Sequence, residues 1–440
     1  MQTAYVQRAH LALRCCIIVA VLATRPRMGA GQDLAVREEG PRWEWGARAI
    51  PLVTRATATP GGRTLVEAYL SQPTLMAGLS WDWLRVHGTL NLEGLTLRRG
   101  ELLQGAWGEG YVDRRHPHAY LHELMVGAVA GSIGASLFGG RGYVPFGSDD
   151  PMLRPFASYP SNHHLAQILE RFVLVGALRL GGVGGEVAVF NGDEPVDPST
   201  LPLARRFGDS WSARLTLHSP ASLGRLAGAE LAGSYAFVKS PEFREGAGLD
   251  QRKTHVGLRI APAPRTGSGY ALLEWARTRD VDRGRTLYTF NSVLAEGALC
   301  RERGGGIALR AEWSERPEEE RLLDAFRAAR PATDNGIVGV THWSTLAASA
   351  TPAALRISVL RAAPFLEVAR VAVARGKGTA FEPALLYGAR DGWRLSAGAR
   401  LAAGTTHERM GRYGVAAGQH LITGHTLQHS PVVRENRCFS

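Results

Sequence analysis

The feature that most constrains this chain is an alternation of apolar and polar residues with a period of two, repeated in short runs. From Leu84 to Leu92 every second residue is Leu, Val or Gly, and the residues between them are Arg, His, Thr and Asn. Comparable runs occur at 211–218, 255–260, 307–313, 355–359 and 393–401. Because successive side chains of a strand point to opposite faces, each run predicts a β-strand with one apolar and one polar face.

Charged residues lie in the middle of the polar faces, and two kinds of β protein allow this. In a soluble sandwich these residues would face water, and that interpretation stays open. In a transmembrane barrel they would line a wet interior while the apolar face contacts lipid. The runs have about the length of nine residues that a tilted strand needs to cross the hydrocarbon layer. Aromatic residues near strand ends, such as Trp211, Tyr235 and Trp393, match interfacial girdles and favour the barrel.

The predicted fold class is therefore all-β, a transmembrane antiparallel β-barrel of about 16 strands, as expected for about 25 residues per strand and connection and an even strand number. Short turns are predicted at 181–184, 361–364 and 390–392, on the periplasmic side. Longer excursions at 139–162, 191–209, 240–253 and 315–336 are predicted on the exterior side, and whether 139–162 folds inward as a constriction loop stays open. The closing strand is either 393–403 or part of an atypical C-terminal tail.

The first residues have the features of a secretory signal peptide. A basic start with Arg8 and Arg14 precedes a short apolar core at 15–23, and small residues at 29–31 suggest cleavage near Ala30. The predicted organisation is a signal peptide at 1–30, an N-terminal lead-in segment at 31–60 and an outer-membrane β-barrel at 61–440. The expected location is the bacterial outer membrane.

Arginine is the candidate functional residue of the barrel interior. The formal net charge is +11, and only Lys239, Lys253 and Lys377 are lysines. Eight arginines fall on polar faces of predicted strands and are the candidate pore-lining residues: Arg85, Arg179, Arg214, Arg259, Arg310, Arg356, Arg394 and Arg400. A ladder of arginines would attract anions, whereas cross-strand pairing with acids such as Glu186, Glu296 and Glu312 would brace the wall. Both interpretations remain open.

The histidines at 116–122 are a candidate metal site. His116, His118 and His122 share one face of an extended strand, and three imidazoles could bind zinc or copper. Pro117 opposes a regular strand, and the alternative is a group of polar residues at a strand mouth. Motifs of serine hydrolases, zinc peptidases, phosphate loops and dinucleotide-binding folds are absent from the sequence. We therefore predict no enzyme activity and no cofactor.

Two short segments resemble phosphate-selective porins O and P. They are Gly140–Gly147, with its Pro-Phe-Gly turn, and Glu186–Gly192, which ends in Phe-Asn-Gly. The resemblance implies a porin-like barrel, a homotrimer, and passage of small solutes with anions among them. The near absence of lysine departs from a phosphate-selective constriction.

The sequence therefore predicts an outer-membrane channel for passive diffusion of small hydrophilic solutes, anions included. The alternative is a non-conducting outer-membrane barrel for adhesion or envelope structure. Expected partners are outer-membrane lipid, lipopolysaccharide and small solutes, and no nucleic acid.

Overall fold

The structure is a computed structural model. It describes residues 40–57, 64–96, 119–130, 133–147, 154–158, 160, 163–195, 198–220, 223, 229–241, 243–260, 268–300, 305–315, 340–357, 360–375 and 392–404. The predicted signal peptide at 1–30 lies outside these residues. Over the described ranges, no helix is long and apolar enough to span a membrane.

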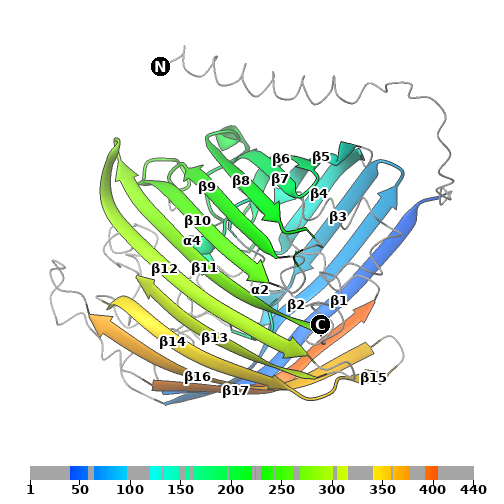
Figure 1. The fold of residues 1–440 in the computed structure, drawn as a ribbon, viewed down its shortest axis with the longest axis vertical. Helices are drawn as coiled ribbons and strands as arrows, with labels where there is room; N and C mark the ends of the chain where they lie inside the picture. The colour runs from blue at the N-terminus through cyan, green and yellow to red at the C-terminus, as the bar shows by residue number, and fades with distance from the viewer. Residues whose placement is uncertain are drawn as a thin grey trace, which may run out of the picture. The chain divides into compact units, whose positions relative to one another are not determined.

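One antiparallel sheet closes on itself to form the barrel (Figure 1). Its strands are β1 (Arg42–Ala56), β2 (Leu65–Trp81), β3 (Leu84–Asn91), β4 (Leu121–Ala130), β5 (Ala135–Gly142), β6 (Arg171–Leu180), β7 (Val183–Phe190), β8 (Ser210–His218), β9 (Glu230–Val238), β10 (Asp250–Ile260), β11 (Ser268–Asp282), β12 (Arg285–Cys300), β13 (Gly306–Glu315), β14 (Val340–Thr351), β15 (Leu355–Ile357), β16 (Leu360–Arg375) and β17 (Gly392–Gly404). The short helices are α2 (Glu93–Thr96), α4 (His163–Ala166) and the 3-10 turn η5 (Ala204–Arg206).

The 17 strand segments of the described chain occupy 16 positions in the wall. β14 and β15 pair with successive parts of β16, Ala350 lying opposite Leu366 and Leu355 opposite Ala362, so the two share one position. The barrel closes where β1 pairs with β17, in a register that places Gly46 opposite Gly404 and Val53 opposite Ala397. Because closure leaves no free edge, the backbone polar groups of the wall are satisfied without water. The expected barrel of about 16 strands is confirmed.

Apolar side chains lie on the outer face of the wall and charged side chains on its inner face, the reverse of the arrangement in a water-soluble protein. Along β13, Ile307 and Leu309 are exposed, whereas Arg310 and Glu312 are buried. The same pattern recurs in β17, where Trp393 and Leu395 are exposed and Arg394 is buried. A wall that exposes its apolar residues and encloses its charged ones is the expected arrangement for an outer surface in contact with lipid.

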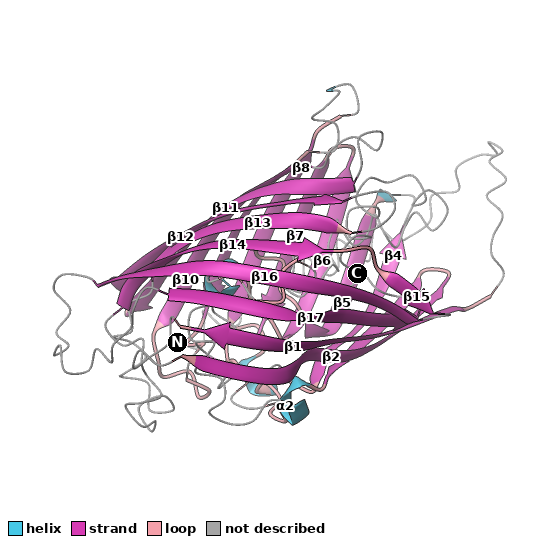
Figure 2. Cartoon of the chain, turned by 90° about the horizontal axis from the view of Figure 1, so that it is seen from below, coloured by secondary structure: helices cyan, strands magenta, loops and turns pink. Residues whose placement is uncertain are grey.

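Connections differ between the two ends of the barrel (Figure 2). At the end that carries the start of β1, β2 and β3 are joined by residues 82–83 and β6 and β7 by residues 181–182. The opposite end carries residues 92–120, 143–170 and 191–209. This asymmetry agrees with the predicted short turn at 181–184 and with the long excursions at 139–162 and 191–209, although residues 283–284 join β11 and β12 at the long-connection end. The predicted short turn at 390–392 is wrong at Gly392, which begins β17 at the long-connection end, and residues 390–391 lie outside the described residues. The predicted turn at 361–364 is wrong, because these residues lie within β16, where Pro364 sits opposite Ala399.

The barrel starts earlier than expected. β1 begins at Arg42, inside the segment 31–60 that was predicted as a lead-in, so the boundary at residue 61 is incorrect. The inward face of β1 carries apolar residues, because Ile50 and Leu52 are buried in a cluster with Ala157 and Phe365. The register shift against β2 between Arg48 and Ile50 leaves the alternation of β1 intact, since the extra residue lies in β2. A strand that is apolar on both faces lacks the period of two on which the prediction depends.

Candidate functional site

The connection between β5 and β6, residues 143–170, folds into the barrel. Tyr143, Val144 and Phe146 are buried with Ile168 in an apolar cluster. The same cluster contains inward residues of β4–β7 and β9, among them Val173, Phe190 and Val238. An apolar cluster on the inner face of these strands fixes the two ends of the connection against one side of the wall.

The segment Arg154–Ser158 of this connection lies against the other side of the wall, and we call it the inner segment. Glu367 of β16 accepts hydrogen bonds from the Ala157 backbone nitrogen, at 2.9 Å, and from the Ser158 hydroxyl. Arg394 of β17 donates to the Ser158 Oγ at 2.7 Å and lies 3.7 Å from a Glu367 oxygen. Glu367 is 1% exposed and Arg394 4%, so these contacts form away from bulk water.

Arg310 of β13 is a second anchor of the inner segment. Its Nη1 donates to the Ser158 carbonyl oxygen at 2.9 Å, and its guanidinium carbon lies 4.1 Å from the centre of the Phe156 ring. Its Nε lies 2.6 Å from a carboxylate oxygen of Glu296, the residue directly opposite on β12. A charge-assisted hydrogen bond and a cation–π contact therefore converge on one buried side chain.

Arg154 and Arg400 complete the attachment. The Arg154 Nη2 donates to Glu274 of β11 at 3.0 Å, and its Nη1 lies 4.0 Å from Glu296. Burial disfavours the charged form of Arg154, yet Glu274 and Glu296 together hold its pKa above the usual range. Arg400 donates to the Pro155 carbonyl oxygen and lies 4.4 Å from the centre of the Phe365 ring.

Opposite charges are paired around the inner segment. Four arginines and four glutamates contribute to this cluster: Arg154, Arg310, Arg394, Arg400, Glu274, Glu296, Glu312 and Glu367. Pairing of opposite charges within this cluster positions the segment. Arg310 and Arg394 therefore connect the barrel wall to the inner segment, through hydrogen bonds to Ser158 and ion pairs with glutamates of the wall.

The remaining candidate arginines lie apart from the inner segment. Arg214 pairs with Glu186 directly across from it on β7 and also contacts the Gly147 carbonyl oxygen at 3.3 Å. Arg259 lies 5.1 Å from the centre of the Tyr270 ring. Arg85 and Arg179 donate to carbonyl oxygens of the nearby turns, at Asp82 and Gly181. The side chain of Arg356 lies outside the described part of the structure.

His122 takes part in a hydrogen-bonded group that secures the end of the connection. Its Nδ1 lies 2.5 Å from Glu170, and its Nε2 contacts the Tyr143 hydroxyl. Both ring nitrogens are thus in use, and His116 and His118 lie outside the described residues. No group of three potential metal ligands occurs among the residues that the structure describes.

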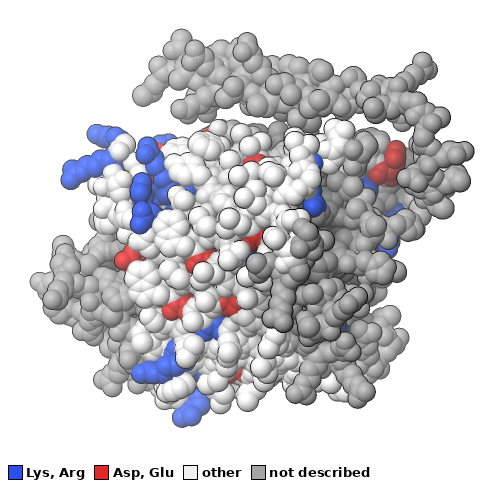
Figure 3. All heavy atoms as spheres, in the orientation of Figure 1, with Lys and Arg blue, Asp and Glu red and all other residues white. Residues whose placement is uncertain are grey.

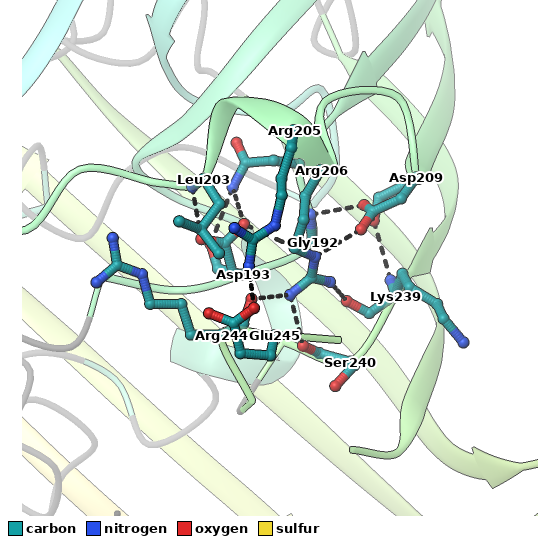
Figure 4. Close-up of polar contacts among 12 residues, drawn as sticks. Gly192, Asp193, Leu203, Arg205, Arg206, Asp209, Lys239, Ser240, Arg244 and Glu245 are labelled. Carbon is teal, nitrogen blue, oxygen red and sulfur yellow. Dashed lines mark hydrogen bonds and ion pairs between the residues drawn. The ribbon is translucent and has the colours of Figure 1, made fainter. Parts of the chain in front are cut away.

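A separate polar cluster joins two long connections at the same end of the barrel (Figure 4). Arg206 lies 2.7 Å from Asp209 and donates to the carbonyl oxygens of Phe243 and Arg244, each at 3.0 Å. Asp209 accepts from the Gly192 nitrogen at 2.8 Å. One guanidinium therefore links the β7–β8 connection to the β9–β10 connection.

Sequence reasoning missed Arg154, Ser158, Glu274 and Glu367, which hold the inner segment. Arg154 and Ser158 fall in the excursion 139–162, which was predicted as exterior. The available signal was local: the excursion contains apolar residues such as Phe146, Leu153 and Phe156, which an exterior loop in water does not need. An apolar loop segment flanked by a charged residue has reason to bury itself.

Comparisons with known proteins identify the fold alone. No family model matches the chain, and no curated protein matches it. The solved structure of OprB from Pseudomonas putida matches with a TM-score of 0.50 and 11% identity, over 83% of this chain and 94% of that one. An anion-selective porin from Comamonas acidovorans matches with a TM-score of 0.49 and 10% identity, over 83% of this chain and 100% of that one. OprB thus supports a porin-like barrel, and no comparison supports the narrower phosphate-selective family.

Proposed function

We propose that this protein is a porin-like channel of the bacterial outer membrane that lets small hydrophilic solutes diffuse passively. The observation that carries the proposal is the wall itself, with apolar residues exposed outside and charged residues enclosed within a closed barrel. A barrel of this size encloses more space than its own side chains fill. The β5–β6 connection lies inside the barrel and narrows this space. A narrowed passage would admit small solutes and exclude larger ones.

The proposed location follows from the same wall and from the leader predicted at 1–30. A leader would deliver the chain across the inner membrane, and the apolar outer surface would then hold it in lipid. The homotrimer and the contacts with lipopolysaccharide that the sequence predicted belong to this proposal as well. Chemical crosslinking of the refolded protein in detergent tests the trimer.

Selectivity for anions is the narrower part of the proposal. Its support is the formal net charge of +11 and the number of arginines that the wall encloses. Selectivity for phosphate is a more specific proposal, and its support is limited to the short motifs at 140–147 and 186–192. Addition of phosphate should reduce a chloride current if both parts hold.

A second candidate is a non-conducting barrel with an adhesive or structural role. The observation that favours it is the number of interior sites at which the β5–β6 connection packs. Besides the cluster around Phe146, Phe156 packs on β11–β14 and β16, and Ala157 packs with Ile50 and Phe365. A connection that contacts so much of the inner wall would plug a barrel if no continuous path remained beside it.

Liposome swelling distinguishes the two candidates. The refolded protein is inserted into liposomes that are then diluted into isotonic solutions of neutral sugars of increasing size. A channel predicts swelling whose rate falls with sugar size. If folding is verified by heat-dependent electrophoretic migration and swelling equals that of empty liposomes, the channel proposal is wrong and the non-conducting barrel replaces it.

A further inference from the structure

The hairpin of β11 and β12 and the neighbouring strand β10 carry a group of arginines on the outer face of the barrel, at the end with the long connections. We call it the rim patch; it consists of Arg252, Arg277, Arg279, Arg283 and Arg285. Four of these side chains are exposed and Arg277 is half-buried. Figure 3 shows basic side chains gathered where this hairpin ends in the same orientation as Figure 1.

The register of the strands places like charges side by side. Arg252 of β10 lies directly opposite Arg279 of β11, and both belong to the exposed face. Directly opposed residues have Cβ atoms about 5 Å apart, and like charges at that distance destabilise a sheet. An anion bound between the two guanidinium groups would remove this repulsion.

Nearby acids compensate only part of the charge. Asp282 lies at the hairpin end, and Glu315 accepts two hydrogen bonds from Asn291, which in turn accepts from Arg277 at 2.7 Å. Asp280 is 0% exposed and belongs to the inward face. Asp250, on the same face of β10 as Arg252, pairs with Lys239. Among the described residues, the five arginines and Lys239 against Asp250, Asp282 and Glu315 leave 6 − 3 = +3. The patch therefore has capacity for a multiply charged anion.

Below the patch, the outer face changes from basic to aromatic to aliphatic. Trp275 lies 5.2 Å from Arg277, and Trp211 and Tyr235 form a contact with ring centres 5.4 Å apart on β8 and β9. The next positions are aliphatic, with Val256 43% and Leu273 52% exposed. This order matches the order of a leaflet: phosphate, interface, hydrocarbon.

The length of the hairpin places the arginines at headgroup height. β11 has 15 residues and β12 has 16, whereas a tilted strand crosses the hydrocarbon layer in about 9–11. The residues nearest the turn thus extend beyond the apolar belt. Since belt and patch are continuous on one face, a ligand with both acyl chains and phosphate contacts both.

We propose that the rim patch binds the phosphorylated headgroup of a lipid whose acyl chains lie on the apolar belt of β10–β12. The site rests on the outer face contacting lipid, which the proposed channel also needs, but not on an open passage. Arg252 and Arg279 hold the phosphate, and Arg283 and Arg285 add charge at the hairpin end.

Native mass spectrometry of the refolded protein in a neutral detergent tests the site. The probe is a bisphosphorylated lipid A, compared with the same lipid after removal of both phosphates. We expect the phosphorylated form to be retained and the dephosphorylated form to be lost. The variant R252Q/R279Q should bind about tenfold more weakly, as expected for two screened charge-assisted contacts. The matched control R42Q/R205Q, which removes two exposed arginines elsewhere, should bind as the original chain does.

Three results would overturn the site. They are equal retention of both lipid forms, equal weakening in the two double variants, and full displacement of the lipid by inorganic phosphate at a concentration equal to that of the lipid. Conductance of R252Q/R279Q in neutral-lipid bilayers should remain that of the original chain. Failure of conductance in both proteins would count against the proposed channel alone and leave the lipid result as it stands.

Discussion

Replacing Glu367 by Ala should release the inner segment while leaving the barrel wall in place. The carboxylate of Glu367 accepts from the Ala157 nitrogen and the Ser158 hydroxyl and is the acid nearest to Arg394 among the described contacts of that arginine. The backbone pairing of β16 with β14 and β17 does not depend on this side chain. The substitution therefore separates attachment of the segment from formation of the barrel.

The expected magnitude follows from the two hydrogen bonds. Each hydrogen bond to a charged acceptor contributes about 1.5–3 kcal/mol in a buried site, and Glu367 is 1% exposed. Loss of both should weaken the attachment by about 3 kcal/mol, taking the lower value for each. That change raises the population with a detached segment about a hundredfold.

Single-channel recording detects the detachment. We expect larger current noise and a raised mean conductance for Glu367→Ala. Glu367→Gln keeps one carbonyl acceptor in nearly the same volume and should lie between Ala and the original chain. The reasoning is refuted if Glu367→Ala folds, shown by heat-dependent migration, and yet matches the original chain in both noise and conductance.

Three further predictions concern stability and the barrel mouth. Arg310→Met leaves the carboxylate of Glu296 buried without its closest cation and should destabilise the protein by about 3–5 kcal/mol, measured as the free energy of unfolding in urea with lipid vesicles. Gly147→Ala should prevent folding, because φ is +73° and a Cβ would lie 1.5 Å from a backbone oxygen; Gly185→Ala, with nothing within 4 Å, should give a normal yield. Arg206→Ala should make the linked β7–β8 and β9–β10 connections sensitive to limited proteolysis, and unchanged cleavage would show that the link is not needed.

The strands were predictable wherever successive residues alternate between two environments, the lipid outside the wall and the interior of the barrel. β3, expected at 84–92, spans Leu84–Asn91, and β8, expected at 211–218, spans Ser210–His218. Closure by the strand expected at 393–403 is confirmed by its pairing with β1. β1 itself was missed because Ile50 and Leu52 on its inward face are apolar, as is Val53 on its outward face. A strand that is apolar on both faces shows no period of two.

The interior was less predictable than the wall. Cross-strand pairs such as Arg214 with Glu186 follow from alternation once the register is known. The partners of Arg394 lie 236 and 27 positions away in the sequence, at Ser158 and Glu367. No local pattern encodes a loop that returns through the barrel to contact distant strands, because burial of such a loop depends on the assembled wall. The roles of the eight arginines in a pore stay predictions.

The conductance of the refolded protein in a planar bilayer tests the central claim most directly. We expect discrete, reproducible current steps, because the inner segment is held at fixed points and leaves a passage of constant width beside it. A correctly folded barrel that inserts into the bilayer without any current step would contradict the account, since the β5–β6 connection would then close the interior.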